Sequence, residues 1–247
     1  MNAGKPTRLL FLLGAVMVAA CTGTGPGTAA GSGAGSGAAA DSSFAALQSA
    51  EIGSYHGQNL SALSDVGKEN IAGVPAVSLD TYRLKIDGLV GAPKELTYDQ
   101  VLAHDHYSKV VTLHCVTGWD ATILWEGVRI TDILAEAGVQ SGAAVPSWIQ
   151  GGEPKVVIFH GVDGYTSALP LSWIQDNNIL LAYKMNGVTI PAELGFPFQV
   201  VAESKWGYKW VKWVNEIELS NDTSYKGYWE RGGYSNNGDV NGPMFEP

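Results

Sequence analysis

The sequence predicts an α+β domain in which mixed β-sheets are accompanied by short helices. Three observations lead to this fold class. Stretches with the two-residue alternation of strands are frequent, the helical patterns are short, and the two do not follow the regular strand–helix–strand rhythm of a parallel sheet. In a chain of 247 residues, a hydrophobic fraction of 45% is ample for a packed core and excludes a wholly disordered protein.

The first 48 residues predict an export signal and a tether. Lys5 and Arg8 precede an uncharged stretch, residues 9–20, which is too short to cross a hydrocarbon core of about 30 Å as a helix and is typical of a signal peptide. The stretch ends in small residues before Cys21, which resembles the lipobox of bacterial lipoproteins. We therefore expect a signal peptide over residues 1–20 and a lipidated Cys21 at the start of a flexible tether over residues 21–48.

This reading places the folded domain, residues 49–247, outside the cytoplasm. The tether is composed mainly of Gly, Ala, Ser and Thr, and such a segment cannot bury enough apolar surface to fold. A lipid on Cys21 predicts that the domain is held at the membrane surface in the cell envelope.

Within the domain, the first predicted elements are a strand over Tyr82–Asp87 and a short helix that runs to Leu102. Alternating apolar and polar residues indicate the strand, and Thr97 with Gln100 has the spacing of a helix capping box. Similar patterns predict strands over 109–116, 155–159, 198–202 and 210–219, and helices over 130–137 and 171–176, the first of which stops at Gly138.

The charge of the chain excludes one class of partner. The formal net charge is −9, and no stripe of Lys and Arg is visible. Since phosphate contacts depend on clustered basic residues, we expect no nucleic-acid binding.

Cys115 is the thiol that remains after lipidation of Cys21, and three interpretations are open for it. It ends a strand whose alternation places Cys115 on the opposite face from His114. It could be an inert core residue, a nucleophile paired with a histidine such as His160, or a soft thiolate ligand of a transition metal. A zinc site is disfavoured because no second Cys of the domain and no suitable His spacing accompany it.

A second cluster lies between Lys205 and Trp213, where three lysines alternate with three tryptophans in an otherwise acidic chain. Lys209 and Lys212 could be solvated charges on an outer strand face. Alternatively, Lys205, Lys209 and Lys212 together could hold a phosphate beside a flat ring system.

Four ordered motifs resemble the molybdopterin-binding domain of the sulfite oxidase family. They are the strand that ends in Cys115 before Gly118-Trp119, the segment 163–170, the segment 181–187 followed by Pro191 and 195–197, and the segment 207–213. The resemblance covers roughly residues 75–220 and is nearest in layout to the single-domain exported members. It implies the family's α+β fold and an oxidoreductase that uses a molybdenum–molybdopterin cofactor.

The resemblance also implies roles for individual residues. Cys115 matches the thiolate ligand of molybdenum, and Tyr165 matches a catalytic tyrosine near the open face of the metal. Trp210, Val211 and Lys212 match the stretch that contacts the molybdopterin phosphate. Tyr55 and His56 match, loosely, an upstream segment that packs on the pterin, and Gln199 stands where the family has a pterin-binding Arg.

Departures from the family pattern bear on the substrate. No Lys or Arg occurs in residues 116–124, directly after Cys115, and Leu194 replaces a common His or Asn. Because a desolvated dianion needs cations, sulfite is an improbable substrate, and a sulfoxide or similar small molecule is favoured. No CxxCH haem motif is present, so we expect a separate haem or quinone protein as electron-transfer partner. The missing twin-arginine signal leaves open a cofactor-free surface binding module on the same fold.

Overall fold

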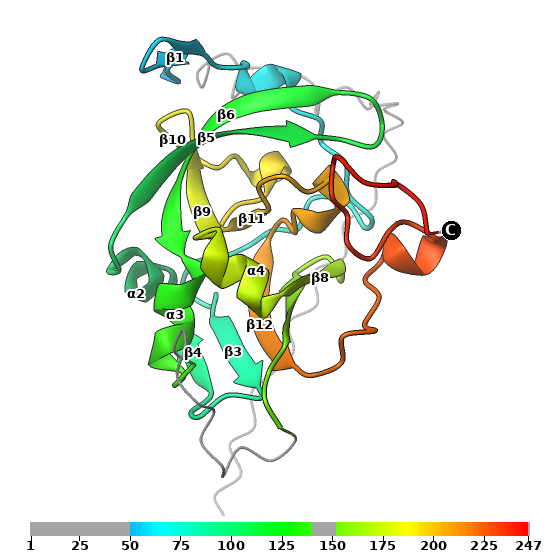
Figure 1. Ribbon diagram of the computed structural model, residues 1–247. Coiled ribbons are helices and arrows are strands. Elements are labelled where there is room, and N and C mark those ends of the chain that lie inside the picture. Colours follow the sequence, from blue (N-terminus) through cyan, green and yellow to red (C-terminus); the bar gives the residue numbers. More distant parts are fainter. Residues whose placement is uncertain (1–49, 140–151, 247) are drawn as a thin grey trace, which may run out of the picture.

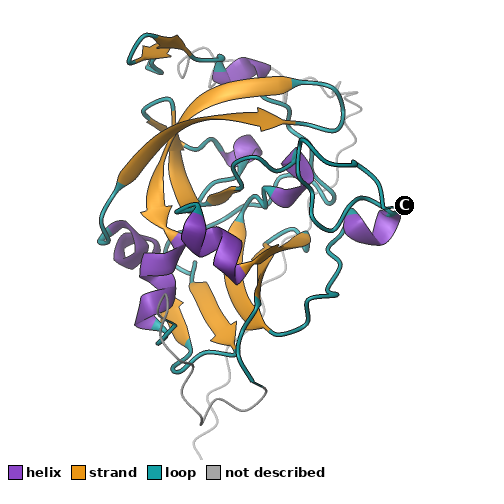
Figure 2. Ribbon diagram, in the orientation of Figure 1, coloured by secondary structure: helices purple, strands orange, loops and turns teal. Residues whose placement is uncertain are grey.

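The computed structural model describes residues 50–139 and 152–246. The predicted signal peptide, the tether and the lipidation site Cys21 lie outside these residues. The described chain contains two five-stranded sheets, with short helices beside them and long loops between them (Figures 1 and 2). This arrangement confirms the predicted α+β class with mixed sheets.

The first sheet has the order β10-β9-β6-β5, with β11 also paired to β9, and its pairs are antiparallel. Its strands are β5 (Tyr107–His114), β6 (Asp120–Arg129), β9 (Leu180–Met185), β10 (Val188–Thr189) and β11 (Gln199–Val201). Asn186 and Gly187 connect β9 to β10 with φ angles of 47° and 82°. Two successive positive φ angles are what a tight hairpin turn requires, so these residues shape the turn between the two strands.

The second sheet has the order β4-β3-β12-β7-β8 and is mixed, because β12 runs parallel to β3 and antiparallel to β7. Its strands are β3 (Leu84–Gly88), β4 (Lys94–Leu96), β7 (Val156–Gly161), β8 (Thr166–Pro170) and β12 (Val214–Ser220). A separate small hairpin, β1 (Ser54–Tyr55) and β2 (Gln58–Asn59), precedes both sheets.

The helices are short, as the sequence predicts. They are α2 (Tyr98–Leu102), α3 (Ile130–Glu136) and α4 (Leu171–Asp176), together with the 3-10 turns η1 (Leu63–Asp65), η2 (Ala192–Leu194), η3 (Gly207–Lys209) and η4 (Glu230–Gly232). The capping box of Thr97 and Gln100 is present. Among the described residues, no helix has the length and apolar character needed to cross a membrane.

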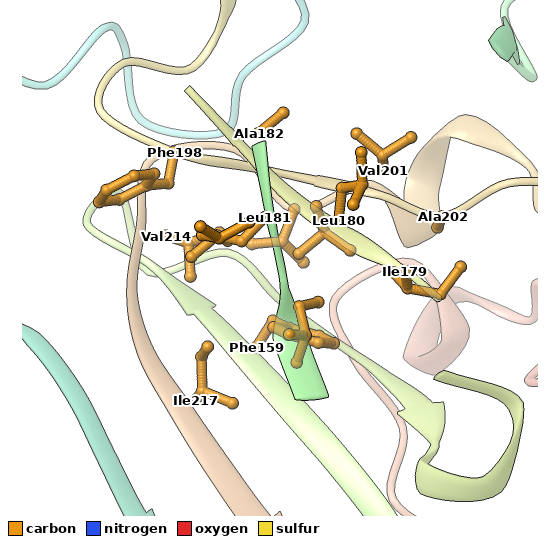
Figure 3. Packing of buried hydrophobic residues seen from close by; sticks show 14 of the residues in the cluster. Phe159, Ile179, Leu180, Leu181, Ala182, Phe198, Val201, Ala202, Val214 and Ile217 are labelled. Atoms are coloured by element: carbon orange, nitrogen blue, oxygen red, sulfur yellow. The ribbon is translucent and has the colours of Figure 1, made fainter. Parts of the chain in front are cut away.

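The core lies between the two sheets. Leu180 and Leu181 of β9 face Val214 and Ile217 of β12 and Phe159 of β7, so residues distant in the sequence form one apolar layer (Figure 3). All five side chains are at most 1% exposed. Burial on this scale stabilises the domain by roughly 1.5–3 kcal/mol per large apolar side chain, and it fixes the loops that emerge at the sheet edges.

The strand predicted over 210–219 is wrong in its first part. Residues 207–209 form η3, and β12 begins only at Val214. Trp213 has a φ of 52°, which interrupts the alternation of faces. The backbone of Trp213 donates to the Gly195 carbonyl, and that of Val214 donates to the Phe198 carbonyl. Lys212 is therefore held in a connection between the sheets, off the outer strand face.

Candidate functional site

A cavity of about 800 Å³, counted with its open mouth, lies at the end of β5 and beside η3. Segments from five parts of the chain form its wall: the loop after η1, the turn after β5, the turn before β8, the segment from η2 to Trp213, and the C-terminal region. The lining residues are Val66, Gly67, Glu69, Asn70, Ile71, Leu113, Cys115, Val116, Thr117, Trp119, Asp163, Tyr165, Leu194, Gln199, Gly207, Tyr208, Trp210, Lys212, Trp213 and Trp229.

Cys115 lies directly after β5, in a turn at the cavity wall. Its N–H donates to the Trp119 carbonyl, and its carbonyl accepts from the Gly118 N–H. The thiol is partly exposed, and its Sγ lies 3.1 Å from the Thr117 hydroxyl. This position makes the thiol accessible to a ligand in the cavity, in contrast to an inert core cysteine.

No histidine is among the described residues that line the cavity. The His114 ring pairs with Asp120, 2.8 Å from Nδ1 to the carboxylate, and the His160 ring pairs with Glu218 at 3.0 Å from Nε2. A nucleophilic cysteine needs a base beside its sulfur. The geometry of the described residues therefore does not support a Cys–His hydrolase.

The segment that begins at Gly207 packs closely against the end of β5. A Cβ atom at position 207 would lie 3.2 Å from the His114 carbonyl oxygen and 3.4 Å from the Cys115 Cα. His114 and Trp206 also form a parallel β-bridge. Glycine permits this approach, which brings the connection after η3 next to the cysteine.

Lys212 reaches the same cavity from this connection. Its stem packs on Gly195, where a Cβ would lie 3.2 Å from the Lys212 Cβ. Its ammonium donates to the Glu69 carbonyl and lies 4.5 Å from the centre of the Trp213 ring. Burial lowers the pKa of Lys212 to about 8, although nearby carboxylates oppose the shift. A partly desolvated cation of this kind is a favourable partner for an anionic group.

The other two lysines of the predicted cluster do not line the cavity. Lys209 is fully buried, and its ammonium lies 2.6 Å from a carboxylate oxygen of Glu230. Lys205 donates to the Asn237 side chain at 2.7 Å. Both lysines fix the C-terminal region to the domain. The interpretation as a solvated charge is therefore wrong for Lys209, and the three-lysine phosphate site is wrong for Lys205 and Lys209.

Tyr165 lines the cavity from the start of β8. Its hydroxyl donates to the Tyr208 carbonyl at 2.6 Å, and its N–H donates to the Asp163 carboxylate at 3.1 Å. Burial raises the pKa of Tyr165 far above its ordinary value. The hydroxyl therefore stays protonated throughout the neutral range and can act as a donor.

The remaining predicted site residues divide into two groups. Gln199 and Trp210 line the cavity. Gln199 is 3% exposed, and its amide has no hydrogen-bond partner among the described residues, so it is free to bind a ligand. Val211 is fully buried in the core, while Tyr55 and His56 lie on the β1–β2 hairpin and do not line the cavity.

Sequence reasoning did not assign a role to several lining residues. Glu69 accepts from the Trp119 indole at 2.8 Å and from the Thr117 hydroxyl at 3.2 Å. Glu69 lies in a loop without periodicity, so no local pattern indicates it. Trp229, from the C-terminal region, also forms part of the cavity wall.

Comparisons with known proteins address the family. Residues 71–229 match the family model described as the oxidoreductase molybdopterin binding domain. The uncharacterized oxidoreductase YuiH of Bacillus subtilis (strain 168) is 35% identical over 159 residues, which cover 64% of this chain and 74% of YuiH. Human mitochondrial sulfite oxidase is 31% identical over 65% of this chain, but the match spans only 33% of that protein.

A solved structure shows the same fold. The sulfane dehydrogenase SoxCD of Paracoccus pantotrophus superimposes with a TM-score of 0.55 and 24% identity, over 65% of this chain and 42% of that chain. The family match covers more than half of the sequence and includes Cys115, Tyr165, Gln199 and Lys212. The chain therefore belongs to the family of molybdopterin-binding oxidoreductases.

Proposed function

We propose that the chain carries out two-electron oxygen-atom transfer on a small molecule, with a molybdenum–molybdopterin cofactor held in the cavity beside Cys115. The observation that carries the proposal is the convergence of a thiol and an ammonium, Cys115 and Lys212, on one cavity from two distant segments. Family membership supplies the cofactor class, and the geometry supports the assignment of individual residues.

The residues present fit such a cofactor. A soft metal ion prefers a thiolate donor, and the Cys115 thiol is accessible at the wall. The phosphate of molybdopterin requires a cation, which Lys212 supplies. The unpartnered Gln199 amide and the Trp210 ring offer hydrogen bonds and a flat apolar surface for a pterin.

When bound, the cofactor supplies a metal centre that exchanges two electrons and an oxygen atom with the substrate. Cys115 would hold the metal, and the Thr117 hydroxyl, which donates to Glu69, would lie beside it at 3.1 Å from Sγ. Lys212 would bind the phosphate. Trp119 and Trp229 would exclude water from the cavity, which strengthens these interactions.

Tyr165 is the proposed proton donor to substrate. Its hydroxyl is protonated at neutral pH, and it lines the same cavity as Cys115. At present it donates to the Tyr208 carbonyl. In the proposed role the hydroxyl would turn away from this carbonyl towards a bound molecule.

The proposed setting of the enzyme follows from the first residues. A signal peptide over residues 1–20 and a lipid on Cys21 would hold the domain at the outer side of a membrane in the cell envelope. A separate haem or quinone protein would exchange electrons with the site, since the sequence has no CxxCH motif.

The experiment is metal and pterin analysis of protein from a host that makes the cofactor. We expect near-stoichiometric molybdenum and one pterin per chain. Cys115→Ala should abolish activity with the fold retained, and Lys212→Ala should lower the pterin content. Lys184→Ala, which removes a partly exposed lysine paired with Glu126, is the matched control and should leave the content unchanged.

Protein without molybdenum and without pterin would contradict the proposal. It would favour the alternative, a cofactor-free binding module on the same fold. Full activity in the Cys115→Ala variant would contradict the role of the thiol separately.

A further inference from the structure

We infer that this site selects uncharged or cationic substrates over oxyanions, and that Glu69 is the residue that sets this selectivity. The inference rests on the proposed function, because it concerns the substrate that would bind in the part of the cavity that the cofactor does not fill. It adds a specificity-determining residue that lies just before the first residue of the family match.

The first observation behind this inference is the set of charged side chains at the cavity wall. Of the described lining residues, three are charged at neutral pH: the carboxylates of Glu69 and Asp163 and the ammonium of Lys212. In the proposed function the Lys212 ammonium binds the cofactor phosphate. The charges that remain to face a substrate are then both negative.

The second observation is the position of the Glu69 carboxylate. Its Oε1 accepts from the Trp119 indole and the Thr117 hydroxyl, and the Thr117 hydroxyl lies 3.1 Å from the Cys115 sulfur. One hydroxyl therefore lies between the carboxylate and the proposed metal ligand. Glu69 is exposed, but these two donors fix its carboxylate at the cavity wall, so an anion that enters the cavity meets a negative charge at a fixed position.

Asp163 strengthens the same field. It accepts from the Tyr165 N–H at 3.1 Å, so its carboxylate is fixed beside the Tyr165 backbone at the cavity wall. An oxyanion in the cavity meets this second fixed carboxylate as well. Desolvating a charged group without a counter-charge costs much free energy, whereas desolvating a neutral dipole costs much less.

The rest of the wall favours apolar or cationic substituents. Trp119, Tyr165 and Trp229 present aromatic surface to the cavity. Indole and phenol rings pack well on apolar groups and attract cations to their faces. With oxygen-atom transfer as the proposed function, the wall and the charges favour a small substrate that is dipolar at the transferred oxygen and uncharged or positive elsewhere, such as an S-oxide or N-oxide.

The test uses three unreactive probes of similar size and different charge: methanesulfonate, dimethyl sulfone and the trimethylsulfoxonium cation. Their affinities for molybdenum-loaded protein are measured by ligand-observed NMR titration, which does not depend on turnover. We expect the anion to bind most weakly. Glu69→Gln keeps an acceptor for Trp119 and Thr117, so it tests the charge alone.

In Glu69→Gln we expect the methanesulfonate affinity to rise roughly tenfold and the trimethylsulfoxonium affinity to fall by a similar factor, as removal of one nearby charge predicts. Dimethyl sulfone should change by less than about threefold. Glu95→Gln is the matched control, an exposed glutamate on β4 outside the cavity, and should behave as the wild type.

Equal binding of the three probes by the wild type would overturn the inference, as would unchanged methanesulfonate affinity in Glu69→Gln. Both results are obtained on protein whose molybdenum content has been measured. Failure of the proposed function would instead appear as missing molybdenum, so the two failures are distinguishable.

Discussion

The buried ion pair of Lys209 and Glu230 gives the sharpest stability prediction. Both side chains are fully buried, and the ammonium lies 2.6 Å from the carboxylate. Glu230 Oε1 also accepts from Ser167 at 2.6 Å, while its Oε2 has no hydrogen-bond partner in the described structure. The perturbation is Lys209→Met, which keeps the apolar stem and removes the charge. Burial already lowers the pKa of Lys209, so the pair depends on mutual compensation.

The expected loss is about 3–4 kcal/mol at pH 7. Removing one partner of a buried pair typically costs roughly 3–5 kcal/mol, because the other charge remains buried. The remaining carboxylate of Glu230 can escape this cost by taking up a proton, which costs roughly 4 kcal/mol for a glutamate at pH 7. The native variant then binds a proton that the unfolded chain does not, so its deficit should shrink as the pH falls towards 5.

The assay is urea unfolding followed by tryptophan fluorescence at pH 7 and pH 5, with molybdenum content matched between samples because a bound ligand adds stability. Lys184→Met, which breaks a partly exposed pair with Glu126, is the control and should lose about 1 kcal/mol or less. A double substitution, Lys209→Met with Glu230→Leu, should recover much of the loss. A loss below about 1 kcal/mol in Lys209→Met would refute the reasoning.

Three further predictions concern the site and the anchor. The Lys212 ammonium loses its proton as the pH rises through about 8, so pyrophosphate binding by metal-free protein should weaken above that pH. Lys212→Arg should remove this pH dependence, because the guanidinium stays charged. Calorimetry from pH 7 to 9.5 measures both proteins, and the same pH profile of affinity in the two would contradict the prediction. Tyr165→Phe should lower kcat roughly 100-fold and leave the molybdenum content unchanged. Steady-state assays should show this loss at both pH 6 and pH 9, because the raised pKa of Tyr165 keeps its hydroxyl protonated. An unaltered kcat would exclude Tyr165 as the proton donor. Cys21→Ser should move the protein from the membrane to the soluble fraction of its native host, and persistent membrane association would argue against the lipid anchor.

Sequence patterns predicted many of the individual elements, because these elements depend on interactions between residues that are close in the sequence. The capping box at Thr97 and the stop of α3 before Gly138 each depend on a few adjacent residues, and each is present. The pairing of β12 with both β3 and β7 joins segments far apart in the sequence, so no local pattern contains it.

Residues of the candidate site could be predicted where they belong to a sequence motif. They could not be predicted where tertiary packing determines their position. Cys115 and Lys212 were identified from the family resemblance and do line one cavity. The fates of Lys209 and Glu69 depend on their neighbours: Lys209 is buried because a C-terminal carboxylate reaches it, and Glu69 lines the cavity because Trp119 and Thr117 bind it. A sequence pattern does not show such partners.

The central claim is that the Cys115 sulfur binds molybdenum, and X-ray absorption at the molybdenum edge tests it most directly. The measurement compares wild-type protein with Cys115→Ser, both loaded in a cofactor-competent host. We expect one fewer sulfur atom in the metal's coordination shell in the variant. The same number of sulfur ligands in both proteins would contradict it.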